Sequence, residues 1–141
     1  MGVNNIDYFN ISSLGNAADF GDLTRITMHA GACSNGTTGL CGAGGSSPGT
    51  NVIDYVTISS LGNATDFGDL TQARYYPGAC EGDGTKGIFS GGTTGSNVNT
   101  IDYVNVSSVG NATDFGDLSA NRRNSHSASN GTRFVSAGGT E

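Results

Sequence analysis

The chain has 141 residues and a net charge of −6, and only six of its residues are lysine or arginine. A length of this order fits one domain, and so few cations argue against a nucleic-acid-binding protein, because phosphate neutralisation needs a clustered basic surface. No stretch approaches the ~18 apolar residues of a membrane span, and the N-terminus lacks the charged and apolar regions of a signal peptide, so we expect neither membrane insertion nor a secretion signal.

One ten-residue sequence occurs three times and divides the chain into repeats. Its copies are LGNAADFGDL from Leu14, LGNATDFGDL from Leu61 and VGNATDFGDL from Val109, so the period is 47 or 48 residues. A fixed period of this length is typical of repeat architectures, in which one unit alone cannot bury its own apolar face. We therefore predict a single repeat domain over residues 1–141, with repeats at about 4–50, 51–98 and 99–141.

Each repeat begins with a segment that we interpret as a strand. The three copies are NNIDYFNISSL from Asn4, NVIDYVTISSL from Asn51 and NTIDYVNVSSV from Asn99. β-branched and aromatic residues dominate these segments, and no helical period is present. In the second copy both faces are partly apolar, with Ile53 on one face and Val56 on the other. Such a strand is typical of sheets that are covered on both sides.

The repeated ten residues follow this strand, and we interpret them as a turn and a short outer strand. Glycine and asparagine at the start tolerate positive φ, and one phenylalanine per copy is expected to fill the space between sheets. These phenylalanines are Phe20, Phe67 and Phe115. Aspartate pairs such as Asp66 and Asp69 are expected to cap turns. A Ca²⁺ site is the alternative, but it needs six or more oxygen ligands, so we predict no metal and no cofactor.

A hairpin closes each repeat. The turn pairs are Asn35-Gly36, Asp83-Gly84 and Asn130-Gly131. Asn-Gly or Asp-Gly between short strands is the strongest local hairpin signal. The second strand of each hairpin is expected to end in a glycine doublet, and these doublets are Gly44-Gly45, Gly91-Gly92 and Gly138-Gly139. Each repeat therefore contains four predicted strands, and no helix is required.

The three cysteines, Cys33, Cys41 and Cys80, argue against a disulfide framework, because their number is odd and their spacing shows no pairs. Cys33 and Cys80 occupy one repeat position, at which the third repeat has Ala128. A position that accepts cysteine or alanine is expected to be a small packing position rather than a reactive thiol.

Together these features resemble the kelch family. A kelch blade has an arginine after the outer strand, a hairpin ending in Gly-Gly, a strand with an Asp-Tyr pair and an outer strand with a large aromatic residue. In order, these features are supplied by Arg74, Gly91-Gly92, Asp102-Tyr103 and Phe115. The chain departs from the family in having phenylalanine rather than tryptophan in the outer strand, and in having Thr27 at the arginine position of the first repeat.

The resemblance implies an all-β fold, a kelch-like β-propeller with three four-stranded blades per chain. The chain starts at the third strand of one blade and ends after the second strand of another. We therefore expect a homodimer that forms a six-bladed ring, in which the C-terminal strands of one chain complete the blade begun by the N-terminal strands of the other. A nine-bladed trimer is the less favoured closure. The rival fold is a monomeric β-trefoil, which also has three repeats.

We expect no enzymatic activity. His29 and His126 occupy different repeat positions, and neither has a nucleophile and an orienting carboxylate at a recognisable spacing. Copper oxidases on kelch-type propellers use His, Tyr and Cys ligands, but they place them within much longer chains. The resemblance therefore carries over the blade and not that chemistry.

A binding site is expected after the closing leucine of each repeat, where the three copies diverge, since propellers carry function on loops. The candidate ligand-binding residues are His29, Arg74, Tyr75, Tyr76, Arg122 and Arg123. Tyrosine and arginine are favoured at recognition surfaces, and the two tyrosines would stack on a sugar ring. The alternative is that these residues enter strands and pack between blades.

Two functional hypotheses follow. The first is a non-catalytic scaffold or interaction module. The wording of the repeats is closest to kelch-like arrays of phage and other viral structural genes, which implies self-assembly and a structural or adhesion role at a host surface. The location would then be a virion or the host cytoplasm. The second hypothesis is a lectin-like glycan-binding protein.

Overall fold

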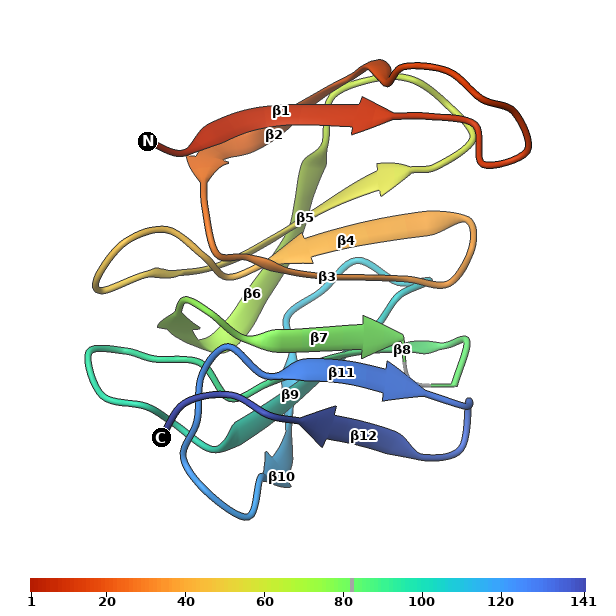
Figure 1. The fold of residues 1–141 in the computed structure, drawn as a ribbon. Helices are drawn as coiled ribbons and strands as arrows, with labels where there is room; N and C mark the ends of the chain where they lie inside the picture. Colours follow the sequence, from red (N-terminus) through yellow and green to blue (C-terminus); the bar gives the residue numbers. More distant parts are fainter. Residues whose placement is uncertain (82) are drawn as a thin grey trace.

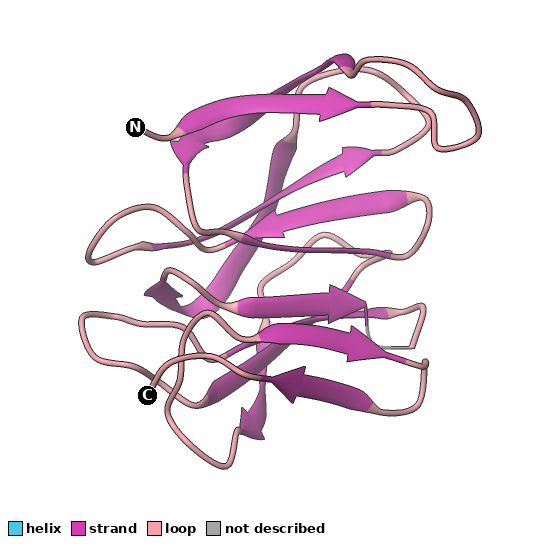
Figure 2. Ribbon diagram, viewed as in Figure 1, coloured by secondary structure: helices cyan, strands magenta, loops and turns pink. Residues whose placement is uncertain are grey.

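The computed structural model describes residues 1–81 and 83–141, and for Cys80 and Glu81 it describes the backbone alone. The described residues form twelve strands and no helix, which confirms the all-β prediction (Figures 1 and 2). Because they hold no helix, none of them forms an apolar helix long enough to cross a membrane. The strands are β1 (Val3–Tyr8), β2 (Ala18–Thr27), β3 (Gly31–Ser34), β4 (Thr38–Gly42), β5 (Thr50–Thr57), β6 (Thr65–Arg74), β7 (Gly78–Glu81), β8 (Lys86–Ser90), β9 (Thr100–Asn105), β10 (Thr113–Asp117), β11 (His126–Ser129) and β12 (Phe134–Ala137).

The strands pair into four antiparallel sheets that follow one another through the molecule (Figure 1). Two sheets have four strands, in the orders β3-β4-β5-β6 and β7-β8-β9-β10. The other two, β1-β2 and β11-β12, have two strands each. Each four-stranded sheet therefore joins the hairpin of one repeat to the first two strands of the next. The strands β3, β7 and β11 contact one another in succession and form the line along which the sheets are stacked.

The predicted hairpins are present, and their turns are held by the predicted residues. Asn35 Oδ1 accepts hydrogen bonds from the N–H groups of Thr37 and Thr38 at 3.1 and 2.9 Å. Asp83 and Asn130 make the equivalent bonds in the next two hairpins. Such side-chain turns satisfy backbone donors that the ladder leaves open, and they start the second strand at a fixed register.

The outer strand is longer than predicted and carries a bulge at its phenylalanine. In β6, Asp66 lies opposite Asp54 and Gly68 lies opposite Ile53, so Phe67 is the extra residue. The same shift occurs at the equivalent phenylalanines of β2 and β10. The first predicted strand is correspondingly too long, since β1 ends at Tyr8 rather than at Leu14. A bulge bends the outer strand and leaves one side chain free to turn towards the neighbouring sheet.

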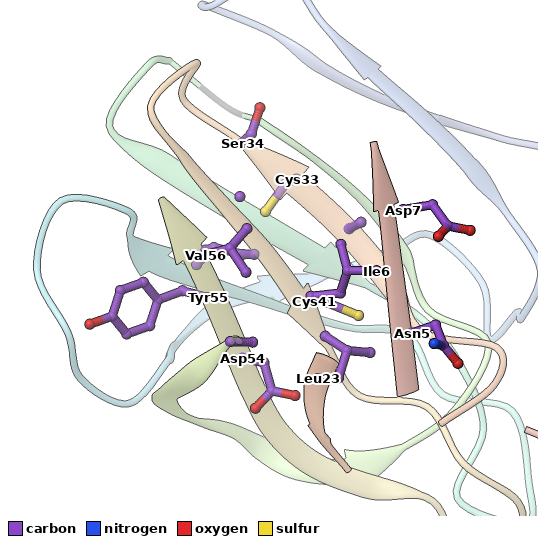
Figure 3. A pocket seen from close by; sticks show the side chains of 14 residues that line it. Asn5, Ile6, Asp7, Leu23, Cys33, Ser34, Cys41, Asp54, Tyr55 and Val56 are labelled. Atoms are coloured by element: carbon purple, nitrogen blue, oxygen red, sulfur yellow. The ribbon is translucent and has the colours of Figure 1, made fainter. Parts of the chain in front are cut away.

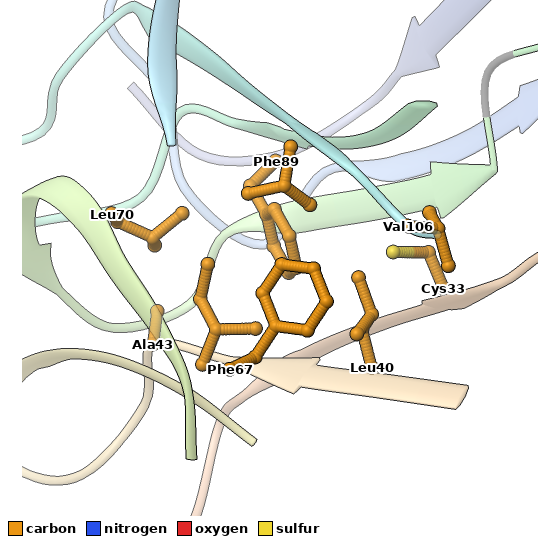
Figure 4. Close-up of a cluster of buried hydrophobic side chains, with 9 residues drawn as sticks. Cys33, Leu40, Ala43, Phe67, Leu70, Phe89 and Val106 are labelled. Atoms are coloured by element: carbon orange, nitrogen blue, oxygen red, sulfur yellow. The ribbon is translucent and has the colours of Figure 1, made fainter. Parts of the chain in front are cut away.

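The core lies between the two four-stranded sheets (Figure 4). Its buried members are Cys33, Leu40, Ala43, Ile53, Phe67, Leu70, Phe89, Val104 and Val106. Cys33 therefore occupies a packing position as predicted, whereas the side chain of Cys80 lies outside the described part of the chain. In the single chain Phe20 and Phe67 are buried, whereas Phe115 of the third copy is 59% exposed.

The glycine doublet of the first repeat is displaced by one residue from the predicted Gly44-Gly45. Strand register places Gly42 opposite Gly31 and Ser90 opposite Gly78, so Ala43 stands where the second repeat has Gly91. Ala43 takes a φ of 61°, close to the 62° of Gly91. The tight turn is thus made by alanine in one repeat and by glycine in the next.

Consecutive sheets are joined by the same backbone hydrogen bonds in each repeat. Gly62 N–H donates to the Phe20 carbonyl at 2.9 Å, and Gly110 N–H donates to the Phe67 carbonyl at 2.9 Å. The glycine of the DFG sequence permits this approach, since a Cβ on Gly68 would lie 2.5 Å from the Gly110 carbonyl oxygen. The repeated ten-residue sequence therefore holds one sheet against the next.

Candidate functional site

Three residues at equivalent repeat positions share an unusual backbone conformation. His29, Tyr76 and Asn124 each follow an outer strand and have φ values of 58°, 59° and 56°. Their backbones form a chain, in which Tyr76 N–H donates to the His29 carbonyl at 2.9 Å and Asn124 N–H donates to the Tyr76 carbonyl at 3.0 Å. Non-glycine residues in this region are uncommon and gather at functional sites. The row therefore marks one end of the stacked sheets as a candidate site.

Aromatic and cationic side chains gather around the middle residue of this row. The Tyr76 hydroxyl lies 3.0 Å from His29 Nε2, and the two rings have centroids 4.0 Å apart. The Tyr75 ring centroid lies 5.2 Å from that of Tyr76, and the Arg123 guanidinium lies 5.8 Å from the Tyr76 centroid. We call His29, Tyr75, Tyr76 and Arg123 the Tyr76 cluster. Stacked rings with a nearby cation suit recognition of planar or polar surfaces.

A hollow of about 570 Å³ adjoins the cluster. Its polar lining residues are His29, Tyr76, Asn124, Ser125, His126 and Ser127. The strands β3, β7 and β11 supply the rest of its wall through small residues such as Gly31 and Gly78. The hollow therefore combines small residues on three strands with polar groups at its edge, an arrangement suited to hydrogen bonds and ring contacts with a ligand.

Arg74 belongs to the interior rather than to a surface that a ligand could contact. Its side chain is fully buried, with its Nη2 2.9 Å from Asp102 Oδ2 and 3.3 Å from the Phe89 carbonyl. Burial lowers the pKa of Arg74, while the neighbouring Asp102 raises it. Four of the six predicted site residues, the members of the Tyr76 cluster, are thus brought together, and Arg74 is not among them.

Arg122 stands apart from the cluster as well. It is half-buried, its Nη1 lies 3.5 Å from the Gly138 carbonyl, and its Nε is buried without a hydrogen-bond partner. Its repeat position is that of Arg74. The predicted alternative, packing between sheets, therefore describes Arg74. Arg122 and Arg123 are both half-buried, and only Arg123 lies over the Tyr76 ring.

Sequence reasoning missed the carboxylates that these arginines bind. Asp54 and Asp102 are both fully buried, and each accepts a hydrogen bond from a threonine at the start of the divergent segment. In the first repeat Thr27 replaces the expected arginine, and Arg25 reaches Asp54 instead at 2.6 Å. The signal was present as an aspartate repeated in every IDY segment, but its partner changes position between repeats.

Two of the repeated aspartates bind the backbone at the bulge of their own outer strand, β6 or β10, and not at a separate turn. Asp66 Oδ1 accepts from Gly68 N–H at 3.1 Å, and Asp114 Oδ1 accepts from Gly116 N–H at 2.9 Å. Among the side chains that the structure describes, which exclude those of residues 80–82, no three His, Cys, Asp or Glu gather in a way that could hold a metal ion. The donor set of the Tyr76 cluster is thus one of rings, hydroxyls and a guanidinium.

No protein-family model matches the chain, and no curated protein matches it.

Proposed function

We propose that this protein is a non-catalytic interaction module built as a kelch-like β-propeller. In this proposal the sheets are blades, and the Tyr76 cluster lies at the binding end of the ring. The observation that supports it most directly is the repetition of one junction, in which Gly62 and Gly110 bond to the preceding outer strand in the same way. Identical junctions turn each unit by the same angle, and such a rotation closes into a ring when enough units are present.

Two copies of the chain would supply the blades of a six-bladed ring. Each copy contributes two four-stranded sheets and two two-stranded sheets. Pairing the two-stranded sheets of one copy with those of another gives complete four-stranded blades, which removes their open edges. The ring is then a rigid platform, and the proposed role is structural or adhesive, of the kind served by kelch-like arrays in virus or phage particles.

The solution mass tests this architecture. Light scattering on a size-exclusion column is expected to give twice the 14.2 kDa of one chain. Three times the chain mass would replace the six-bladed ring by a nine-bladed one. A mass of one chain at all concentrations would contradict the ring; the closed trefoil is not an alternative, because the described strands form four separate open sheets.

A second candidate function, glycan binding, is favoured by the adjacent rings of Tyr75 and Tyr76. Their centroids lie 5.2 Å apart and both side chains are half-buried, so each ring presents part of its surface to solvent. Sugar rings stack on such faces through their C–H groups. A glycan array is the test, with Tyr75→Ala and Tyr76→Ala as the variants. The matched control is Tyr103→Ala, since Tyr103 lies in β9 against Phe115 and outside the Tyr76 cluster.

Glycan binding that is lost in the first two variants and kept in Tyr103→Ala would establish the lectin function. Binding to no glycan at all would remove it and leave the scaffold function. Binding that survives both variants would place the glycan site elsewhere than in the Tyr76 cluster.

A further inference from the structure

The carboxylate of Asp7 lacks the arginine and threonine partners that bind the equivalent aspartates of the other two repeats. Asp54 and Asp102 occupy the same repeat position and are fully buried against an arginine and a threonine. Asp7 is exposed, and among the described residues it makes no ion pair. The position that binds arginine in two repeats is therefore open in the first.

Arg122 lacks the carboxylate partner that the equivalent Arg74 has in Asp102. It stands at the repeat position of Arg74, and Ser119 stands at that of Thr71, the threonine that donates to Asp102. The Nε of Arg122 is buried without a hydrogen-bond partner, as are those of Arg25 and Arg74. Unlike those two arginines, Arg122 also has no carboxylate within ion-pair distance among the described residues, so its half-buried charge lacks a counter-charge.

Apolar side chains show the same difference between the ends and the interior. Phe115 is 59% exposed while its equivalent Phe67 is 2% exposed. Val135, in β12, is 53% exposed while its equivalent Leu40 is 2% exposed. Identical positions differ because the interior ones are covered by a following sheet. The uncovered ends need a sheet of the same kind.

Two cavities lie where that sheet would fit. One, of about 590 Å³, lies between β1 and the sheet β3-β4-β5-β6, and Ile6, Leu23, Cys41 and Val56 are among its lining side chains (Figure 3). The other, of about 410 Å³, is lined by Phe115 and Ile88 on one side and by the β11-β12 hairpin on the other. The first adjoins a half sheet without an inner hairpin. The second adjoins a half sheet without outer strands.

We propose that a second copy of this chain fills both cavities, and that Asp7 of each copy forms a buried ion pair with Arg122 of the other. This inference rests on the proposed two-chain ring and assigns its joint. The β11-β12 hairpin of one copy enters the 590 Å³ cavity of the other, and β12 pairs with β1. Ser136 then lies opposite Asp7, as Cys41 lies opposite Asp54 in the complete sheet.

The backbone at the joint continues the pattern of the interior junctions. Gly15 N–H of one copy donates to the Phe115 carbonyl of the other, as Gly110 N–H donates to the Phe67 carbonyl. Gly116 leaves room for this contact, because a Cβ placed on it meets nothing within 4 Å in the single chain. Charge, backbone polarity and apolar surface at the two ends are thus complementary to each other, and the partner is a second copy.

Charge reversal tests the pair, since each joint takes one residue from each copy. The variants Asp7→Arg and Arg122→Asp each place like charges at both joints of a homodimer, so each is expected to run at the mass of one chain. An equimolar mixture restores the dimer, because the mixed pair has one native joint and one reversed joint. The double variant carrying both changes is also expected to dimerise.

The control is Asp66→Arg on β6, which reverses an exposed charge in a complete four-stranded sheet, away from both proposed joints. This control is expected to stay dimeric. Far-UV circular dichroism checks that each variant retains its strands, and a variant that loses them is judged by the double variant instead.

The outcomes separate this inference from the proposed ring. A wild-type chain that runs as a monomer would contradict the ring itself. A dimeric wild type whose single variants remain dimeric would leave the ring standing and overturn the Asp7–Arg122 joint. Single variants that are monomeric but are restored neither by mixing nor by the double variant would overturn the joint as well.

Discussion

The Arg74 guanidinium lies 2.9 Å from the Asp102 carboxylate, and both side chains are fully buried. Thr71 Oγ1 donates to the same carboxylate at 2.7 Å and its N–H donates at 3.2 Å. The pair connects the end of β6 to the middle of β9, and so fixes one sheet to the next. It shows that the repeats are held together by buried polar groups as well as by the apolar core.

Removal of one partner of this pair is expected to destabilise the fold strongly. Asp102→Ala leaves the buried Arg74 without a counter-charge, and we expect the free energy of unfolding to fall by about 3–5 kcal/mol. Chemical denaturation measures this change. Asp66→Ala, which removes an exposed hydrogen bond to Gly68 within β6, is the control and is expected to cost about 1 kcal/mol or less. Equal losses in the two variants would contradict the structural role of the pair.

Two phenylalanines at the same repeat position, Phe67 and Phe115, are expected to contribute different amounts to the free energy of unfolding. Phe67 is 2% exposed and packs in the core, so Phe67→Ala is expected to lower the free energy of unfolding by about 3–5 kcal/mol. Phe115 is 59% exposed in the single chain, so Phe115→Ala should cost far less there. Both are measured by denaturation in the Asp7→Arg background, which removes assembly from the comparison. A Phe115→Ala loss as large as that of Phe67→Ala would contradict the exposure difference.

Gly68 and Gly116 have nearly the same backbone conformation but different surroundings. Their alanine variants therefore distinguish backbone strain from a steric clash with a neighbouring sheet. Gly68 has a φ of 139° and Gly116 a φ of 134°. A Cβ on Gly68 would lie 2.5 Å from the Gly110 carbonyl oxygen, whereas one on Gly116 meets nothing within 4 Å. We expect Gly68→Ala to cost about 1–3 kcal/mol more than Gly116→Ala in the Asp7→Arg background. Thermal unfolding of both variants gives the difference, and equal melting temperatures would refute the steric argument.

Cys41 is expected to react slowly with thiol reagents at neutral pH. Burial raises the pKa of its thiol above the ordinary value of 9.0, against the lowering effect of Arg25. The reactive thiolate is then scarce near neutrality and becomes populated as the pH rises through the raised pKa. Alkylation followed by peptide mass spectrometry from pH 7 to 10 measures the rate, with the denatured chain as reference. A folded-chain rate equal to that reference at pH 8 would contradict the prediction.

The raised pKa of the Cys41 thiol also determines how this group changes the stability of the fold with pH. A thiol whose pKa is raised in the folded state contributes its full share of stability below the unfolded pKa. That share is lost as the pH rises through the folded pKa. Cys41→Ser is therefore expected to flatten the alkaline fall of the melting temperature.

The sequence by itself predicted those parts of the structure that depend only on neighbouring residues. The strands and the three hairpins of the described residues follow from β-branched segments and from Asn-Gly or Asp-Gly turns, which act over a few residues. The turn bonds of Asn35 and Asp83 are of this kind, since donor and acceptor are two or three residues apart. Such features can be predicted because they do not depend on the rest of the fold.

The tertiary structure alone decided which of the repeated residues are buried and which residues meet. Arg74 and Arg123 stand in the same divergent segment type, yet one is enclosed beside Asp102 and the other lies over the Tyr76 ring. Phe67 and Phe115 have the same local sequence and opposite exposure. Burial and ion pairing depend on the neighbouring sheet. Arg74 and Asp102 are 102 − 74 = 28 residues apart in the sequence, so no local pattern predicts their contact.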